Sequence, residues 1–345
     1  MSQAWARSVR TVDSHTEGNP TRVIVGGVPV PPGSTLLQQR DWLRDHDDGL
    51  RKLLNFEPRG SGLMCSVLLL PPHTPTAHFS AIIMEQEEYV PMCGHCIIGT
   101  AMTVVNEAMV ALTEPVTTVR FDTPAGLVSC DVAVANGVVG AVSFDNVESF
   151  VLHRNATLVA PPLGDLVVDV TFGGDLYVHV DADQLGLELS LANDSALIDA
   201  SGHIRAAVAQ QLDTTHPENP DINRCYQVLF TSARVASGDY KQTIVCPPGS
   251  LDRSPCGTGT SGRVALLVDK GAMAMHETRK FEGPLGTCMI GEAVHRETRN
   301  GIDFITPRIT GNAYVTGYHH FVLAQDDPLY EGYRVGPSGN SQGTH

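Results

Sequence analysis

One short pattern, Cys-Gly followed by four residues and a second Gly, occurs twice in the 345-residue chain, from Cys93 to Gly99 and from Cys256 to Gly262. In both places a proline stands one or two residues before the cysteine, and an apolar run follows. Proline, glycine and hydroxyl residues at the start of an apolar run are typical of a helix N-terminus. The two cysteines are 163 positions apart (256 − 93), close to half the chain. The repeat therefore predicts an internal duplication, with one such helix in each half.

The rest of the chain shows mainly the alternating apolar pattern of strands, separated by turn-rich segments. Helical spacing covers residues 35–54 and 193–212, and we expect the second cysteine helix to end near Met275. Residues 13–20 are polar and turn-rich, which predicts a loop. A segment with prolines and glycines marks a candidate boundary at residues 150–164. The sequence thus predicts two similar α/β halves, each a mostly antiparallel sheet around one long helix.

Composition limits the partners of this protein. The chain has 23 basic and 38 acidic residues, a formal net charge of −15, which argues against binding to nucleic acid or to an anionic membrane. The first seven residues lack the apolar stretch of an export signal, and no apolar run reaches transmembrane length. Eight cysteines in such a chain are expected to be reduced thiols. These features predict a cytoplasmic location.

The repeated cysteines allow several interpretations. Both could be small buried hydrophobic residues, as most free cysteines are. Cys93 and Cys96 have the Cys-x-x-Cys spacing of thiol–disulfide oxidoreductases, but the segment around Cys256 has no such pair. One Cys-x-x-Cys supplies only two zinc ligands, and no second pair lies at a suitable spacing. We therefore expect no metal site.

Proton transfer at carbon uses both cysteines together. A thiol at a helix N-terminus meets unpaired backbone N–H groups and the positive end of the helix dipole, which favour its thiolate. Inversion of a stereocentre without a cofactor needs a base on one face of the carbon and an acid on the other, and two thiols can fill these roles. Backbone N–H groups at two helix starts could also hold a substrate carboxylate and stabilise the developing carbanion. This is the interpretation that residue chemistry favours.

The segment from Asp252 to Ser261, DRSPCGTGTS, and the segment MCGH at residues 92–95 resemble the proline racemase family. Further matching segments are Asp13-Ser14-His15-Thr16, Thr21-Arg22-Val23, Glu57-Pro58-Arg59-Gly60, Phe172-Gly173-Gly174, Ile309-Thr310-Gly311 and Asp326-Asp327-Pro328. The family contains proline racemases, 4-hydroxyproline epimerases and 3-hydroxyproline dehydratases.

The resemblance implies an α+β fold of the diaminopimelate-epimerase type, with two pseudo-symmetric lobes, each a mostly antiparallel sheet or barrel around a central helix, and an active site in the cleft between them. Residues 1–155 would form the lobe that carries Cys93, completed by C-terminal strands at 309–333. Residues 156–308 would form the lobe that carries Cys256, and residues 334–345 a disordered tail.

The same resemblance implies roles for individual residues. Cys93 and Cys256 would be the catalytic acid/base pair, and Asp252 would hold the ring nitrogen of the substrate. The carboxylate would be held by Gly94, His95, Gly257 and Thr258, largely through backbone N–H groups. No metal, pyridoxal phosphate or nicotinamide is implied. The partner would be a small imino acid, and the protein would be a monomer or a homodimer.

Two further cysteines bear on the substrate. Dehydratases of this family carry Thr at the position of Cys256, so the thiol here favours a 1,1-proton transfer. Cys65 and Cys246 stand where proline racemases tend to place phenylalanine, and smaller residues leave room for a ring substituent. We therefore expect epimerisation of trans-4-hydroxy-L-proline to cis-4-hydroxy-D-proline. Alternatives are a proline racemase, a 3-hydroxyproline dehydratase or epimerase, and, outside these enzymes, a Cys-x-x-Cys redox protein.

Overall fold

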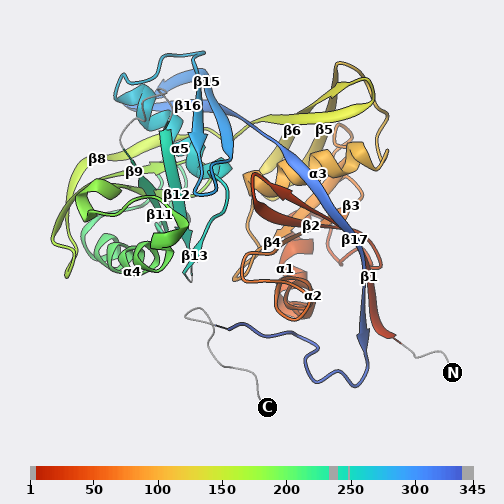
Figure 1. Cartoon of the computed structure of the whole chain (residues 1–345). Coiled ribbons are helices and arrows are strands. Elements are labelled where there is room, and N and C mark those ends of the chain that lie inside the picture. The colour runs from red at the N-terminus through yellow and green to blue at the C-terminus, as the bar shows by residue number, and fades with distance from the viewer. Residues whose placement is uncertain (1–4, 233–239, 248, 336–345) are drawn as a thin grey trace. The chain divides into compact units, whose positions relative to one another are not determined.

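The structure, a computed structural model, describes residues 5–232, 240–247 and 249–335 (Figure 1). The chain forms two compact units. Unit 1 comprises Met1–Phe144 and Asn312–His345, and unit 2 comprises Asp145–Gly311. The division between residues 155 and 156 that the sequence predicted falls within a strand of unit 2, Phe150–Val159. Of the predicted disordered tail, residues 336–345 lie outside the described residues.

The strands of unit 1 are β1 (Trp5–Thr16), β2 (Asn19–Gly26), β3 (Cys65–Leu70), β4 (Phe79–Met84), β5 (Val116–Thr123), β6 (Gly126–Ala135), β7 (Val138–Asp145) and β17 (Ala313–Ala324). Its helices are α1 (Leu36–His46), α2 (Gly49–Asn55) and α3 (Gly94–Asn106). Strands pair antiparallel from β17 to β1 and on to β2, then β2 pairs parallel with β3. The order continues antiparallel to β4, parallel to β5, and antiparallel to β6 and β7.

The strands of unit 2 are β8 (Phe150–Val159), β9 (Asp165–Phe172), β10 (Leu176–Asp181), β11 (Gln227–Thr231), β12 (Tyr240–Cys246), β13 (Ser250–Leu251), β14 (Thr278–Glu282), β15 (Cys288–Arg299) and β16 (Ile302–Gly311). Its helical segments are η1 (Ala182–Leu185), η2 (Leu191–Asn193), α4 (Asp194–Gln211) and α5 (Gly257–Asp269). Pairing runs antiparallel from β8 to β9 and β10, parallel to β11, antiparallel to β12, parallel to β14, and antiparallel to β15 and β16.

The two units therefore repeat one sequence of strand pairings, which confirms the duplication predicted from the cysteine pattern. Helix α3 follows β4 in the first repeat, and α5 follows β12 and β13 in the second. In chain order the first repeat runs from β1 to β8 and the second from β9 to β17. The last strand of each repeat pairs with the first strand of the other, since β8 pairs with β9 and β17 with β1.

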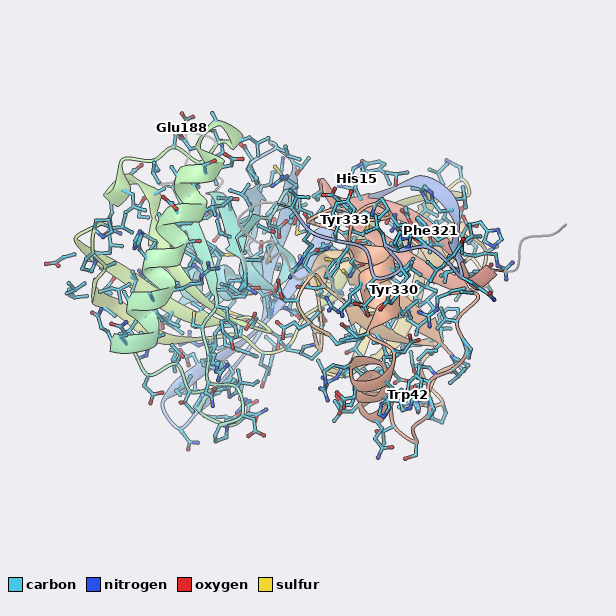
Figure 2. The ribbon with its side chains drawn as sticks, turned by 90° about the horizontal axis from the view of Figure 1, so that it is seen from below. His15, Trp42, Glu188, Phe321, Tyr330 and Tyr333 are labelled. Atoms are coloured by element: carbon cyan, nitrogen blue, oxygen red, sulfur yellow. The ribbon has the colours of Figure 1, made fainter. Side chains whose placement is uncertain are left out.

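The chain's return to unit 1 extends beyond β17. Figure 2 labels Phe321, Tyr330 and Tyr333, which come from the end of the chain and lie among the side chains of unit 1. Tyr333 and Glu57 exchange backbone hydrogen bonds of 2.7 and 3.1 Å. The guanidinium of Arg22 lies 4.2 Å from the centre of the Phe321 ring. These contacts attach the C-terminal segment to the first unit.

The two cysteine helices form the centres of the units. Every residue of α3 from Gly94 to Val105 is buried, which matches a helix that is apolar on all sides. The final glycine of the repeated pattern lets a strand approach closely. A Cβ on Gly99 would lie 3.0 Å from Ser14 Oγ on β1, and a Cβ on Gly262 would lie 2.3 Å from Thr171 Oγ1 on β9. Strands β1 and β9 occupy equivalent places in the two repeats. The final glycine of the Cys-Gly pattern therefore makes the same helix–strand contact in both units.

Residues 13–20, predicted as a loop, instead belong to a β-hairpin. Strand β1 continues to Thr16, and β2 begins at Asn19. The two turn residues, Glu17 and Gly18, have φ angles of 48° and 101°, as a tight hairpin with matching twist requires. Polar side chains are tolerated in these strands because they are paired, as shown by the 2.8 Å ion pair between Arg22 and Asp13.

Helix boundaries differ from the prediction at two places. The stretch at 35–54 forms two helices, α1 and α2, interrupted around Asp47 and Asp48. Helix α5 ends at Asp269, before the predicted Met275. Gly271 adopts φ 66°, and the next N–H, of Ala272, bonds back to Leu267 O at 2.8 Å. This arrangement closes a helix C-terminus in a left-handed turn.

Among the described residues, no helix is both long and apolar enough to cross a membrane.

The contact between α5 and β9 predicts the effect of adding one methyl group. Gly262→Ala should lower the free energy of unfolding by about 1–3 kcal/mol, because the new Cβ would overlap Thr171 in a well-packed interior. Gly202→Ala is the matched control, since it also lies within a helix but a Cβ there meets nothing within 4 Å. That change should raise the free energy of unfolding by about 0.5–1 kcal/mol through helix propensity. Denaturant titration of both variants measures the contrast, and equal effects would contradict the close-packing argument.

Candidate active site

Cys93 occupies the N-cap of α3, the position that sequence patterning predicted. Its backbone is extended, with φ −145° and ψ 120°, and its carbonyl accepts the first helical bond, from the Ile97 N–H at 3.0 Å. Helix geometry leaves the N–H groups of Gly94 and His95 outside the intrahelical hydrogen bonds. The start of α3 therefore combines a thiol with donors suited to an anion.

His95 connects two thiols. Its Nδ1 lies 3.2 Å from Cys93 Sγ, and its Nε2 lies 3.4 Å from Cys96 Sγ. The His95 carbonyl accepts a 2.8 Å hydrogen bond from Thr16 Oγ1 on the hairpin, which fixes this turn of the helix. Burial lowers the pKa of His95 to about 4. The imidazole is therefore neutral near pH 7, and only one of its nitrogens carries a proton.

Opposing effects act on the ionisation of Cys93. A hydrogen bond from the Cys96 side chain favours ionisation, but burial and the nearby Glu85 and Cys65 oppose it and raise the pKa of Cys93 to about 12. The backbone N–H of Cys96 at the helix start does favour the thiolate of Cys93, but withdrawal of the sulfur from water outweighs this effect. This thiol keeps its proton at neutral pH.

Cys65 is the first residue of β3 and lies beside His95 and Cys96. Its Sγ, Cys96 Sγ and a His95 ring nitrogen all lie within 4.8 Å of one another. A network of amides fixes the segment before it: the Gln86 side chain donates to Ser61 O at 3.0 Å and to Met64 O at 2.8 Å.

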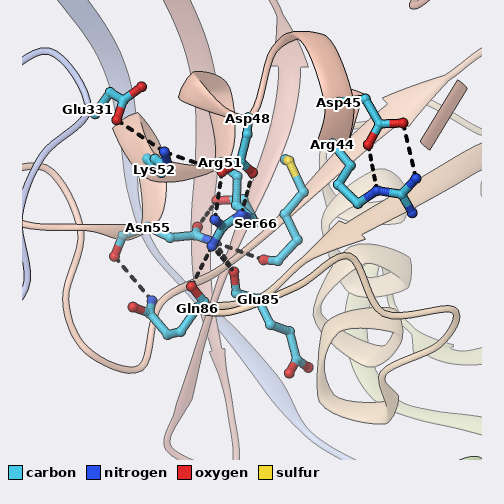
Figure 3. Close-up of polar contacts among 11 residues, drawn as sticks. Arg44, Asp45, Asp48, Arg51, Lys52, Asn55, Ser66, Glu85, Gln86 and Glu331 are labelled. Carbon is cyan, nitrogen blue, oxygen red and sulfur yellow. Dashed lines mark hydrogen bonds and ion pairs between the residues drawn. The ribbon is translucent and has the colours of Figure 1, made fainter. Parts of the chain in front are cut away.

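The anchors of that network are drawn in Figure 3. Asn55 donates from its side chain to Met84 O at 2.8 Å and accepts a hydrogen bond from Ser66 Oγ. Arg51 donates to the carbonyl of Gln86 and pairs with Asp48 at 2.7 Å. The start of β3 is therefore held by a network of buried side-chain hydrogen bonds.

Cys256 occupies the N-cap of α5 in unit 2. Its φ is 66°, a left-handed conformation that is uncommon for a residue with a side chain and that occurs often at functional sites. Its Sγ accepts a hydrogen bond from the Gly259 N–H at 3.4 Å and lies 3.5 Å from Thr258 Oγ1. The Tyr177 hydroxyl lies 3.8 Å from the same sulfur and 2.6 Å from Thr258 Oγ1. Several potential donors therefore lie around this sulfur, and the Cys256 side chain also hydrogen-bonds to the Asp252 carboxyl.

Asp252 lies just before the helix and is buried. Its Oδ1 accepts hydrogen bonds from Ser254 N at 2.8 Å and Ser254 Oγ at 3.0 Å, and Ser254 Oγ accepts from Cys256 N at 3.0 Å. Burial raises the pKa of Asp252 to about 6, although the hydrogen bonds from Ser254 oppose the shift. At pH 7 the group is a buried carboxylate, which suits a cationic amine.

Cys246 packs with Cys256 against a small apolar cluster of Tyr177, Leu229 and Ile244. Sequence analysis did not identify Tyr177. The one feature of the sequence that could have pointed to Tyr177 is its position three residues after Gly174, near the start of β10.

The predicted site residues thus fall into two sets. Unit 1 gathers Cys65, Cys93, Gly94 and His95, and unit 2 gathers Cys246, Asp252, Cys256, Gly257 and Thr258. Their catalytic and binding roles remain predictions.

Comparison with known proteins places this arrangement in context. Residues 11–334 match the family model described as proline racemase. A 4-hydroxyproline 2-epimerase of Streptosporangium roseum is 38% identical over 327 residues, which cover 95% of this chain and 98% of the relative. A proline racemase of Clostridioides difficile is 34% identical over 330 residues, with 95% and 98% covered.

The fold agrees with these matches. The structure of a hydroxyproline epimerase from Agrobacterium vitis with bound trans-4-OH-L-proline is similar with a TM-score of 0.90 and 29% identity, covering 99% of each chain. The predicted α+β fold of the diaminopimelate-epimerase type is confirmed.

The buried carboxyl of Asp252 predicts a pH dependence of stability. Its pKa is about 6 in the folded protein against a usual value of 3.8, so the folded state binds more protons than the unfolded state between these values. This group therefore contributes stability below about pH 4 that is lost as the pH rises through 6. Asp252→Asn keeps an acceptor for Ser254 but cannot ionise, so its stability relative to wild type should increase by about 2–3 kcal/mol between pH 4 and pH 7. Urea titrations at both pH values measure this difference, and a parallel dependence in both proteins would contradict it.

Proposed function

Because the chain belongs to the proline racemase family, and its relatives include isomerases of proline and hydroxyproline, we propose that it epimerises 4-hydroxyproline at Cα without a cofactor, interconverting trans-4-hydroxy-L-proline and cis-4-hydroxy-D-proline. The observation that carries the proposal is the pair of thiols at the N-caps of two equivalent 13-residue helices. The similarity to proteins named as hydroxyproline epimerases supports the substrate.

Substrate binding would use the starts of both helices. Unpaired N–H groups of Gly94 and His95 in one unit, and of Gly257 and Thr258 in the other, would hold the carboxylate. Asp252 would accept a hydrogen bond from the protonated ring nitrogen. Since its pKa is about 6, it is ionised near pH 7, and the substrate's positive charge favours that form further.

The surroundings of the two sulfurs suggest which cysteine is the acid and which is the base. Cys93, with a pKa of about 12, would start as the acid. Cys256 would act as the base, with the Gly259 N–H and the Thr258 hydroxyl as hydrogen-bond partners of its sulfur. Cys256 would take the Cα proton while Cys93 delivers its own proton to the opposite face. One turnover would leave the proton on Cys256 and a thiolate at Cys93, the form needed for the reverse reaction.

Substrate preference would depend on Cys65 and Cys246. Both are small, and Cys246 packs beside Cys256. Their size supports acceptance of a ring hydroxyl group. The similarity to a protein named proline racemase keeps unsubstituted proline as the second candidate substrate.

The two-thiol mechanism predicts the effect of removing either sulfur. Cys93→Ser and Cys256→Ser should each lower epimerisation of trans-4-hydroxy-L-proline by about 10²–10⁴-fold, because a hydroxyl is a far weaker acid and base in these positions. Cys130→Ser and Cys225→Ser change buried thiols elsewhere in units 1 and 2 and serve as controls. Chiral chromatography measures the product, and substantial activity in both N-cap variants would rule out the mechanism.

Exchange of the α-proton in D2O, followed by NMR, separates the candidate substrates. We expect fast exchange with trans-4-hydroxy-L-proline and cis-4-hydroxy-D-proline, and much slower exchange with L-proline and trans-3-hydroxy-L-proline. Fast exchange with L-proline would instead favour a racemase. A stable redox couple of Cys93 and Cys96, with no exchange in any imino acid, would favour a thiol redox protein.

A further inference from the structure

We propose that Cys65, His95 and Cys96 form a binding site for a thiophilic divalent cation, with Zn²⁺ as the ion that the ligand set suits best. The three side chains come from β3 and from the first turn of α3, and all are buried. Two thiolates and one imidazole are the ligands that zinc prefers among protein groups. The proposal concerns binding and does not depend on the proposed epimerase function.

The three ligand atoms would have to move only a little to coordinate an ion. Zn–S and Zn–N bonds of about 2.3 and 2.0 Å at a tetrahedral angle place the sulfur and nitrogen about 3.5 Å apart. Cys96 Sγ and His95 Nε2 are 3.4 Å apart, and all three ligand atoms lie within 4.8 Å of one another. The side chain of Asn19 also lies 3.4 Å from His95 Nε2, so an ion would displace that contact.

The other ring nitrogen of His95 has a partner of its own. Nδ1 lies 3.2 Å from Cys93 Sγ, so a proton on Nδ1 can be donated to that sulfur while Nε2 keeps its lone pair for the ion. Histidine ligands of metals usually donate a hydrogen bond from the N–H of their second ring nitrogen, most often to an oxygen acceptor, and this bond fixes both tautomer and orientation. Here the acceptor would be a sulfur.

The ligands are held in place before any ion binds. Gln86 and Asn55 fix the start of β3 beside Cys65, and the Thr16 hydroxyl holds the His95 carbonyl at 2.8 Å. Preorganised ligands lose little conformational freedom on binding, which favours affinity. Three protein ligands leave the fourth zinc position for water or another small ligand.

Binding exchanges protons for the ion. Zn²⁺ would replace the thiol protons of Cys65 and Cys96, giving two Zn–S bonds, one Zn–N bond and two protons released to solvent. Apparent affinity should therefore rise up to 100-fold per pH unit while both thiols are protonated in the free protein.

Spectroscopic titration of the reduced, chelator-treated full-length protein tests the site. Co²⁺ is the probe, because thiolate ligands give it a charge-transfer band in the near ultraviolet, and Zn²⁺ is then added in competition. We expect one ion per chain, a band typical of thiolate ligation, and displacement of Co²⁺ by Zn²⁺. Absence of the band at saturating Co²⁺ would overturn the proposal.

Variants identify the ligands. Cys65→Ser and Cys96→Ser should each weaken binding at least about 100-fold by the loss of one of three ligands, whereas Cys130→Ser, a buried thiol on β6, should bind as wild type. Unchanged binding in both ligand variants would overturn the assignment. A measurement on the wild type covers the case of a poorly folded variant: bound Zn²⁺ should slow alkylation of Cys65 and Cys96 but not of Cys130, and equal rates with and without Zn²⁺ would also overturn it.

Discussion

Close approach between a buried helix and a β-hairpin is the constraint on which both units depend. Gly99 on α3 and Gly262 on α5 leave space for Ser14 and Thr171, and neither contact has room for an ordinary side chain. The same contact positions the helix start, because Thr16 on that hairpin also holds the His95 carbonyl. The close packing at Gly99 fixes the position of α3 against the hairpin, and this position also determines where the N-cap thiol of Cys93 lies.

Sequence patterns predicted much of the fold, for reasons visible at particular residues. The cysteine helices could be predicted because proline and glycine mark their starts and apolar runs follow. The hairpin at residues 13–20 could not, because its buried polar residues look like a loop until Arg22 and Asp13 are known to pair. The early end of α5 depends on a left-handed Gly271, one of many glycines in the chain with no local feature to distinguish it.

Site chemistry was less predictable than site location. The sequence located both N-cap cysteines, but the ionisation of Cys93 is decided by burial, by the nearby Glu85 and by Cys65, which is distant in sequence. Tyr177 reaches Thr258 only through the folding of unit 2. Cys65 stands 31 positions before Cys96, so no short spacing rule could join the two as ligands. Contacts between distant segments depend on sheet register, which a single sequence does not specify.

The exchange of terminal strands between the repeats has a consequence for synthesis. Unit 2 occupies one continuous stretch, Asp145–Gly311, so all of its strands are synthesised before β17. Most of unit 1 precedes unit 2 in the chain, yet its strand β1 has no β17 beside it until the segment after unit 2 is made. During that interval β1 presents an unpaired edge, the kind of surface that chaperones shield and that aggregation exploits. The half that is translated first is thus the half that is completed last.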